Sequence, residues 1–196
     1  MNPRRRLLIA AAAVAAVQIG FLASMIAGRA AILRNGQEVL LQARPADPRD
    51  LLRGDYVVLG TNISSIPVSL FDEARPLREE ARARTVFVRL REGDGGIWRP
   101  VAARYGERPE PEPVEGEVDI RGSTSSTWFE GTTAINVQYG LERLYVPEGE
   151  GRAIETAGWR EEGADFRMKV AVARDGAAQI KSFHDGETLL YAVPLY

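Results

Sequence analysis

Near the N-terminus, an uncharged, apolar run extends from Leu7 to Gly28, and three arginines lie just before it. As a helix this run would be about 33 Å long, which matches a bilayer hydrocarbon core of about 30 Å. We therefore predict a basic N-terminus at residues 1–6, a transmembrane anchor at 7–28 and a linker at 29–37. The run is longer than the apolar part of a cleaved signal peptide, so we expect the anchor to be retained.

The basic residues before the run favour a cytoplasmic N-terminus, by the positive-inside rule. Residues 38–196 would then form a domain outside the cytoplasmic (inner) membrane, in the periplasm or its equivalent. Arginines at positions 29, 34 and 44 reduce this charge asymmetry. Small and polar residues that share a helix face could contact a membrane partner, with exposure to lipid as the alternative: Gln18, Gly20, Ser24 and Gly28.

Beyond residue 37 apolar and polar positions alternate, with turn-forming residues about every ten positions. Val86, Val88 and Leu90 share one face of a predicted strand, which a glycine-rich turn at 92–96 joins to a second strand at 97–104. A three-strand meander is predicted from 166–173, 178–183 and 188–195. These patterns predict a mostly β domain, an antiparallel barrel or sandwich with two or three short helices.

Two longer runs stand out within this pattern. Residues 55–63 carry apolar groups on both faces, which is typical of a central strand, and a capped helical turn at 47–54 leads into them. A second long strand is predicted at 134–146, followed by a short helix at 147–156. Arg143 interrupts the apolar face of this strand, and a bulge near Gly140 could re-aim it. The residues expected on that face are Ile135, Val137, Tyr139, Leu141 and Tyr145.

The first of these runs carries a resemblance. Gly54, Asp55 and Tyr56, followed by Leu59, resemble the signature of the GDYXXLXY family of membrane-anchored bacterial proteins, and the runs 47–53 and 139–151 are also similar to that family. One position departs from the pattern, because its last tyrosine is Thr61 here. Family members occur joined to, or beside, multi-span membrane proteins, so the resemblance implies such a partner. It supplies location and architecture rather than a reaction.

The composition of the chain excludes several classes of binding and catalytic site. The net charge of −2 provides no basic field for nucleic acid. The chain has no cysteine, and His184 is its single histidine, so cysteine sites and histidine clusters within one chain are excluded. We expect no cofactor and no metal.

The sequence contains residues for two catalytic arrangements, a serine–lysine pair and a pair of carboxylates. A serine–lysine hydrolase would use Lys169 as its base, but no serine stands in a suitable motif. Asp55, Glu142 and Glu148 could approach one another if the two long strands are neighbours, and paired carboxylates can perform acid–base chemistry. Arg53 and Arg143 lie beside two of these carboxylates in the sequence, which favours a structural ion-pair network instead.

The sequence therefore predicts a non-enzymatic interaction or scaffold module of a membrane complex, held by its anchor in the lipid and associated with a multi-span partner. The candidate binding residues belong to the two motif regions: Arg53, Asp55, Tyr56, Tyr139, Glu142, Arg143, Tyr145 and Glu148. The alternatives are an envelope hydrolase that uses paired carboxylates and a sensor of a small ligand or peptide.

Three further segments carry expectations. Residues 107–115 alternate proline and glutamate, which favours an exposed, extended spacer. Residues 72–84 predict a short surface helix or a loop. His184 precedes a turn, and we expect it to be exposed there.

Overall fold

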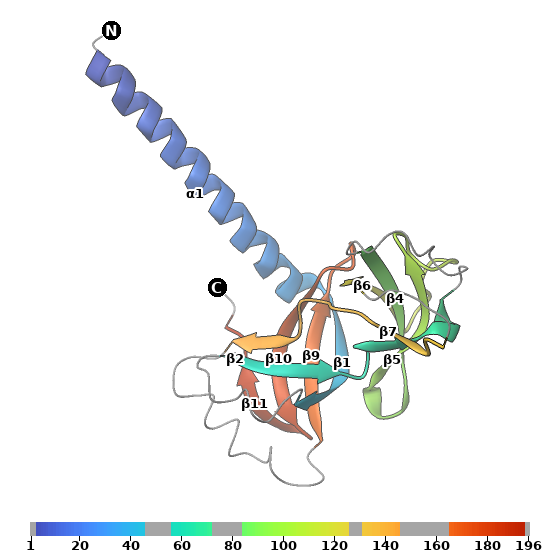
Figure 1. Ribbon diagram of the computed structural model, residues 1–196. Coiled ribbons are helices and arrows are strands. Elements are labelled where there is room, and N and C mark those ends of the chain that lie inside the picture. The colour runs from blue at the N-terminus through green and yellow to red at the C-terminus, as the bar shows by residue number, and fades with distance from the viewer. Residues whose placement is uncertain (1–2, 46–55, 72–83, 126–130, 146–164, 195–196) are drawn as a thin grey trace.

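The computed structural model describes residues 3–45, 56–71, 84–125, 131–145 and 165–194 (Figure 1). A long helix, α1 (Pro3–Asn35), projects from a β domain (Figure 1). Among the described residues α1 alone is long and apolar enough to cross a membrane, with a mean hydropathy of 2.2 in its most apolar stretch. The helix continues through Asn35, so residues 29–35, assigned above to a linker, are helical.

The larger sheet has six antiparallel strands in the order β11-β10-β9-β1-β2-β8. Three of them, β9, β10 and β11, are consecutive in the chain and adjacent in the sheet, which confirms the predicted meander. The described strands of this sheet are β1 (Gln37–Pro45), β2 (Tyr56–Thr61), β8 (Arg143–Tyr145), β9 (Phe166–Val172), β10 (Ala178–Asp185) and β11 (Thr188–Ala192).

A second sheet has three strands in the order β5-β4-β6. The predicted hairpin is confirmed, because β4 (Arg84–Glu92) pairs with β5 (Trp98–Tyr105) across the short 3-10 helix η3 (Asp94–Gly96). On its other side β4 pairs with β6 (Glu117–Thr124). A small pair joins β3 (Ser65–Pro67) to β7 (Ala134–Asn136), and a second 3-10 helix, η2 (Val68–Leu70), follows β3.

One hydrophobic core joins the sheets. Val86, Val88 and Leu90 of β4 are fully buried, as their alternation predicts. The alternating residues Phe166, Met168, Val170 and Val172 of β9 are also buried. Both sets belong to one cluster that includes Val39 and Leu41 of β1. Alternating strands that bury one face each, with few helices between them, confirm the mostly β fold.

The prediction of one long strand at 134–146 is wrong. The structure divides this segment into β7, which pairs with β3, and β8, which pairs with β2. Between them Gly140 has a φ of +76°, a region that glycine adopts at little cost, so the chain is re-aimed near the expected position. The inward parity changes between Leu141 and Leu144, which are each 2% exposed, so Tyr145, expected on the buried face, is 64% exposed.

The predicted helical turns at 47–54 and 147–156 lie outside the described residues. The segment 72–84 also lies outside them, except for Arg84, which begins β4.

Candidate interaction site

The two motif-bearing segments meet in space. β2, which carries the end of the Gly54–Leu59 signature, pairs antiparallel with β8 so that Tyr56 faces Tyr145 and Val58 faces Arg143. The Leu59 amide extends this pairing by donating to the Glu142 carbonyl oxygen over 2.9 Å. The strands expected to be neighbours are therefore neighbours, although the second one is short.

Two of the predicted site residues stabilise this junction from inside. Tyr139 is 8% exposed, and its hydroxyl donates to the Ile63 carbonyl oxygen over 2.9 Å. Burial, with a smaller contribution from the charge of Glu142, raises the pKa of Tyr139 far above its usual value. The Glu142 carboxylate accepts from the Tyr139 amide over 2.6 Å. Both side chains therefore hold the turn that redirects the chain at Gly140.

Two others face outward. Arg143 and Tyr145 are exposed on β8, which lies at one end of the six-stranded sheet. Both line a groove of about 350 Å³, and Arg29 of α1 lines the same groove. The sheet therefore curls enough to bring the β8 edge beside the helix.

The remaining predicted site residues are not placed. Arg53, Asp55 and Glu148 lie outside the described residues, and for Tyr56 only the strand is described. The proximity of Asp55, Glu142 and Glu148 stays a prediction. Glu142 is already engaged by a backbone amide, so its carboxylate has a structural use.

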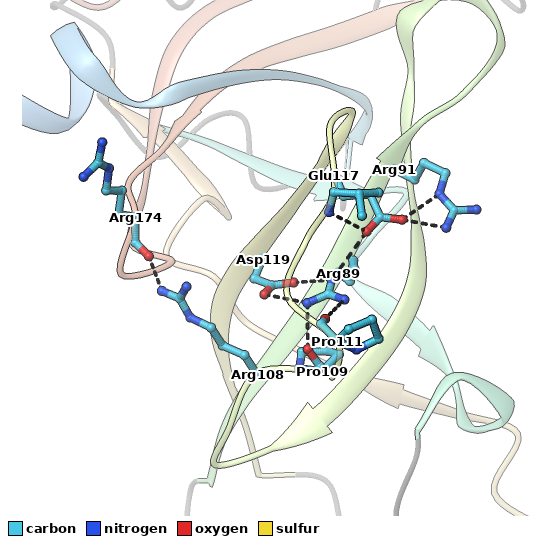
Figure 2. Close-up of polar contacts among 9 residues, drawn as sticks. Arg89, Arg91, Arg108, Pro109, Pro111, Glu117, Asp119 and Arg174 are labelled. Carbon is cyan, nitrogen blue, oxygen red and sulfur yellow. Dashed lines mark hydrogen bonds and ion pairs between the residues drawn. The ribbon is translucent and has the colours of Figure 1, made fainter.

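The three-stranded sheet contains a buried ion-pair network that we did not predict from the sequence (Figure 2). Arg89 of β4 donates to both carboxylate oxygens of Asp119 on β6, over 2.8 and 3.0 Å. The same guanidinium donates to the Pro109 carbonyl oxygen over 2.6 Å and to that of Pro111. Because the side chains of Arg89 and Asp119 are 6% and 1% exposed, this charge pair is desolvated and held by several charge-assisted hydrogen bonds.

Residues 107–115 are mostly exposed, as expected, but they do more than connect two strands. Pro109 is buried, and the Pro109 and Pro111 carbonyl groups cover Arg89. Arg108 donates to the Arg174 carbonyl oxygen at the turn between β9 and β10, which ties the segment to the larger sheet (Figure 2). A cavity of about 710 Å³ lies beneath the segment. Its glutamates at 107, 110 and 112 are exposed, as the acidic pattern predicts.

Glu117 extends the network toward solvent. Its carboxylate accepts from Arg91 over 2.9 and 2.5 Å, and hydrogen bonding to Arg91 is the main reason that its pKa lies below the usual carboxyl value. A sequence signal was present, because arginines at 89 and 91 face acids at 119 and 117 directly across the β4–β6 pair. Arginines at every second position of one strand, and acids at every second position of a later strand, indicate such a cross-strand arrangement.

His184 and Lys169 lie in different surroundings. His184 was expected in an exposed turn, which is wrong: it lies half-buried on β10, with Nε2 2.7 Å from the Ser182 hydroxyl. Burial, together with the charge of Lys169, lowers the pKa of His184. Lys169 lies 3.6 Å from the Glu38 carboxylate, an ion pair rather than a desolvated base. Among the described residues no cluster of three or more potential ligands could hold a metal.

Comparison with known proteins gives one result. No curated protein and no solved structure matches the chain. The sequence model of the GDYXXLXY protein family matches residues 18–183, from within α1 to the end region of β10. The match includes both motif regions, whose strands pair as β2 and β8. The chain therefore belongs to the GDYXXLXY family.

Proposed function

We propose that this protein is a single-pass membrane protein whose β domain lies outside the cytoplasmic membrane and acts as a non-enzymatic interaction or scaffold module. The partner would be a multi-span membrane protein. The contact surface would be the exposed β8 edge, with Arg143 and Tyr145, next to the place where α1 leaves the bilayer.

The observation that carries this proposal is the close junction between helix and domain. Gly36 alone separates α1 from β1, and its amide donates to the Ile32 carbonyl oxygen over 2.8 Å. A Cβ atom at Gly36 would lie 2.6 Å from the Ile32 carbonyl oxygen and 3.1 Å from the Ala171 Cβ. Ala30 and Leu33 of the last helical turns are buried. This packing gives the domain a fixed orientation relative to its anchor, whereas a flexible linker would leave the orientation free.

The fixed orientation suits contact with another membrane protein. The orientation of two partners in one bilayer is already restricted by their anchors, and a rigid domain presents one edge to its neighbour. The helix face with Gly20 and Gly28 would add contacts within the bilayer, because small residues let two helices approach closely.

Charged side chains in the β domain support a binding role over a catalytic one. Arg89 donates to Asp119, Arg91 donates to Glu117, and the Glu142 carboxylate accepts from the Tyr139 amide. An envelope hydrolase would need carboxylates that are free to exchange protons with a substrate. The described residues that line the large cavity beneath residues 107–113 carry both charges and include one aromatic ring, Phe87, which does not favour a sensor of an apolar ligand.

Photo-crosslinking in intact membranes tests the proposal. The full-length protein would carry a photoreactive residue at position 145. The matched control is position 188, which is exposed at the start of β11. Thr188 lies opposite Asp185, roughly 20 Å along β10 from Ala178 at the groove end. We expect a discrete adduct with a multi-span protein at 145 and none at 188. Equal adducts at both positions, or no protein adduct at 145, would contradict the proposal.

A further inference from the structure

The groove beside the β8 edge is lined by side chains from the membrane helix and from three strands. Arg29 comes from α1, Arg143, Leu144 and Tyr145 come from β8, and Ile180 and Tyr191 come from β10 and β11. Its volume is about 350 Å³, and it opens on the side of the domain where the helix departs. A membrane anchor and three strands of the six-stranded sheet thus form one concave surface.

The level of the groove relative to a bilayer follows from α1. Arg29 is the first charged residue after the apolar run Leu7–Gly28. If that run fills the hydrocarbon core, Arg29 lies among the lipid headgroups on the domain side. The other walls of the groove must then lie at headgroup level as well, because they share a cavity with Arg29.

The described residues that line the groove include two arginines and no carboxylate. Arg29 and Arg143 are both exposed, and within the part of the chain that the structure describes no carboxylate lies within ion-pair distance of Arg29. Guanidinium groups recognise phosphate through paired N–H donors, so the groove is complementary to an anionic phosphate group.

The rest of the lining favours a lipid over a soluble phosphate. Leu144, Ile180 and Val193 provide apolar surface beside the arginines, and Tyr145 and Tyr191 provide rings with a polar tip. Tyrosine is enriched at membrane–water interfaces because its ring contacts apolar groups while its hydroxyl stays hydrated. A free phosphate ion would make no use of this apolar surface, whereas the glycerol and upper acyl carbons of a phospholipid would cover it.

We propose that this groove binds the headgroup phosphate of an anionic phospholipid, with Arg29 and Arg143 as its cationic contacts. The proposal requires that α1 cross a bilayer, and it does not depend on the identity of a protein partner. The bound lipid would fill the space between anchor and sheet edge. The larger cavity under residues 107–113 is a poorer phosphate site, because carboxylates such as Glu112, Glu117 and Asp119 are among its lining residues.

The test uses the full-length protein in nanodiscs that contain zwitterionic lipid with a minor fraction of phosphatidylglycerol, followed by native mass spectrometry of the lipids that remain bound. We expect phosphatidylglycerol to be retained in preference to the zwitterionic lipid. Arg143→Gln should reduce that preference about fivefold, and the double change with Arg29→Gln should reduce it further. Arg29→Lys should restore most of the loss caused by Arg29→Gln, because the charge returns.

The control is Arg99→Gln, which removes one exposed arginine on β5 outside the groove. It should leave the lipid preference unchanged. An equal loss for Arg99→Gln and Arg143→Gln would overturn the proposal, because the attraction would then belong to the whole surface. Displacement of the lipid by millimolar inorganic phosphate would also overturn it, since the groove would then be a phosphate site that does not recognise the lipid.

Discussion

Arg89 on β4 and Arg143 on β8 are the same residue type in opposite surroundings. The Arg89 guanidinium is buried, with the Asp119 carboxylate and the Pro109 and Pro111 carbonyl groups as partners. Arg143 is exposed on the edge of the larger sheet and lines a groove with a second arginine. The comparison shows that charge alone does not identify a binding residue. What separates the two positions is burial, because the Arg89 side chain is 6% exposed beside a carboxylate that is 1% exposed, whereas Arg143 is exposed beside a groove.

The largest effect should come from Asp119→Ala in the network. This change leaves the Arg89 charge buried without its carboxylate, so we expect the free energy of unfolding to fall by about 3 kcal/mol. Urea unfolding of the full chain in detergent micelles, followed by tryptophan fluorescence, would measure it. The control Glu107→Ala removes a 75% exposed carboxylate 3.7 Å from Arg104 and should change stability by less than about 0.5 kcal/mol. A similar effect of both changes would remove the distinction between buried and exposed pairs.

A second change acts on the helix junction that forms one wall of the groove. Gly36→Ala places a Cβ atom 2.6 Å from the Ile32 carbonyl oxygen, so the backbone must shift. We expect a loss of about 1–3 kcal/mol and faster amide hydrogen exchange in the facing parts of β9 and β10. Gly28→Ala is the matched control in the same helix, because nothing lies within 4 Å of its Cβ position. Unchanged exchange in Gly36→Ala would mean that the helix does not depend on this contact.

A third prediction concerns pH. The folded-state pKa of Glu117 is lowered, mainly by its hydrogen bond to Arg91, so its contribution to stability is complete above the usual carboxyl value of 4.5. That contribution is lost as the pH falls through the folded-state pKa. Glu117→Gln should therefore flatten the fall of stability between about pH 5 and pH 2, by less than the effect of Asp119→Ala. The exposed Glu112→Gln should leave the profile as in the wild type. Parallel profiles for wild type and Glu117→Gln would contradict this assignment.

The smallest effect on stability is expected at the groove. Arg143→Gln should change the free energy of unfolding by less than about 1 kcal/mol, because its side chain is exposed on an edge strand. The same variant should lose much of the preference for anionic lipid. A change that leaves the fold intact and alters binding would separate Arg143 from Arg89, and a loss of several kcal/mol would place it in the same structural class.

The sequence predicted well wherever local periodicity decides the outcome. The hairpin of β4 and β5 and the meander of β9, β10 and β11 follow from alternation and glycine turns, because register is set by which face is buried. The anchor helix follows from length and lack of charge. Long-range pairing was harder: neither the pairing of β7 with β3 nor the cover that residues 109–111 give to Arg89 has a local signal.

The candidate site was predicted in part. The two motif regions do meet, and Arg143 and Tyr145 are exposed there, but Tyr139 and Glu142 serve the fold. Sequence spacing could not distinguish them, because the parity that faces inward changes between Leu141 and Leu144. Arg29 was assigned to a linker, and its place in the groove depends on the helix continuing to Asn35.

We propose that the β8 edge lies at the membrane surface because the anchor holds the domain in one orientation. The decisive measurement attaches a fluorophore at position 145 or 188 of the full-length protein, in nanodiscs that contain lipids with a headgroup quencher. We expect strong quenching at 145 and little at 188, which lies at the far end of the sheet. Equal quenching at the two positions would contradict it, because the domain would then have no fixed orientation relative to the bilayer.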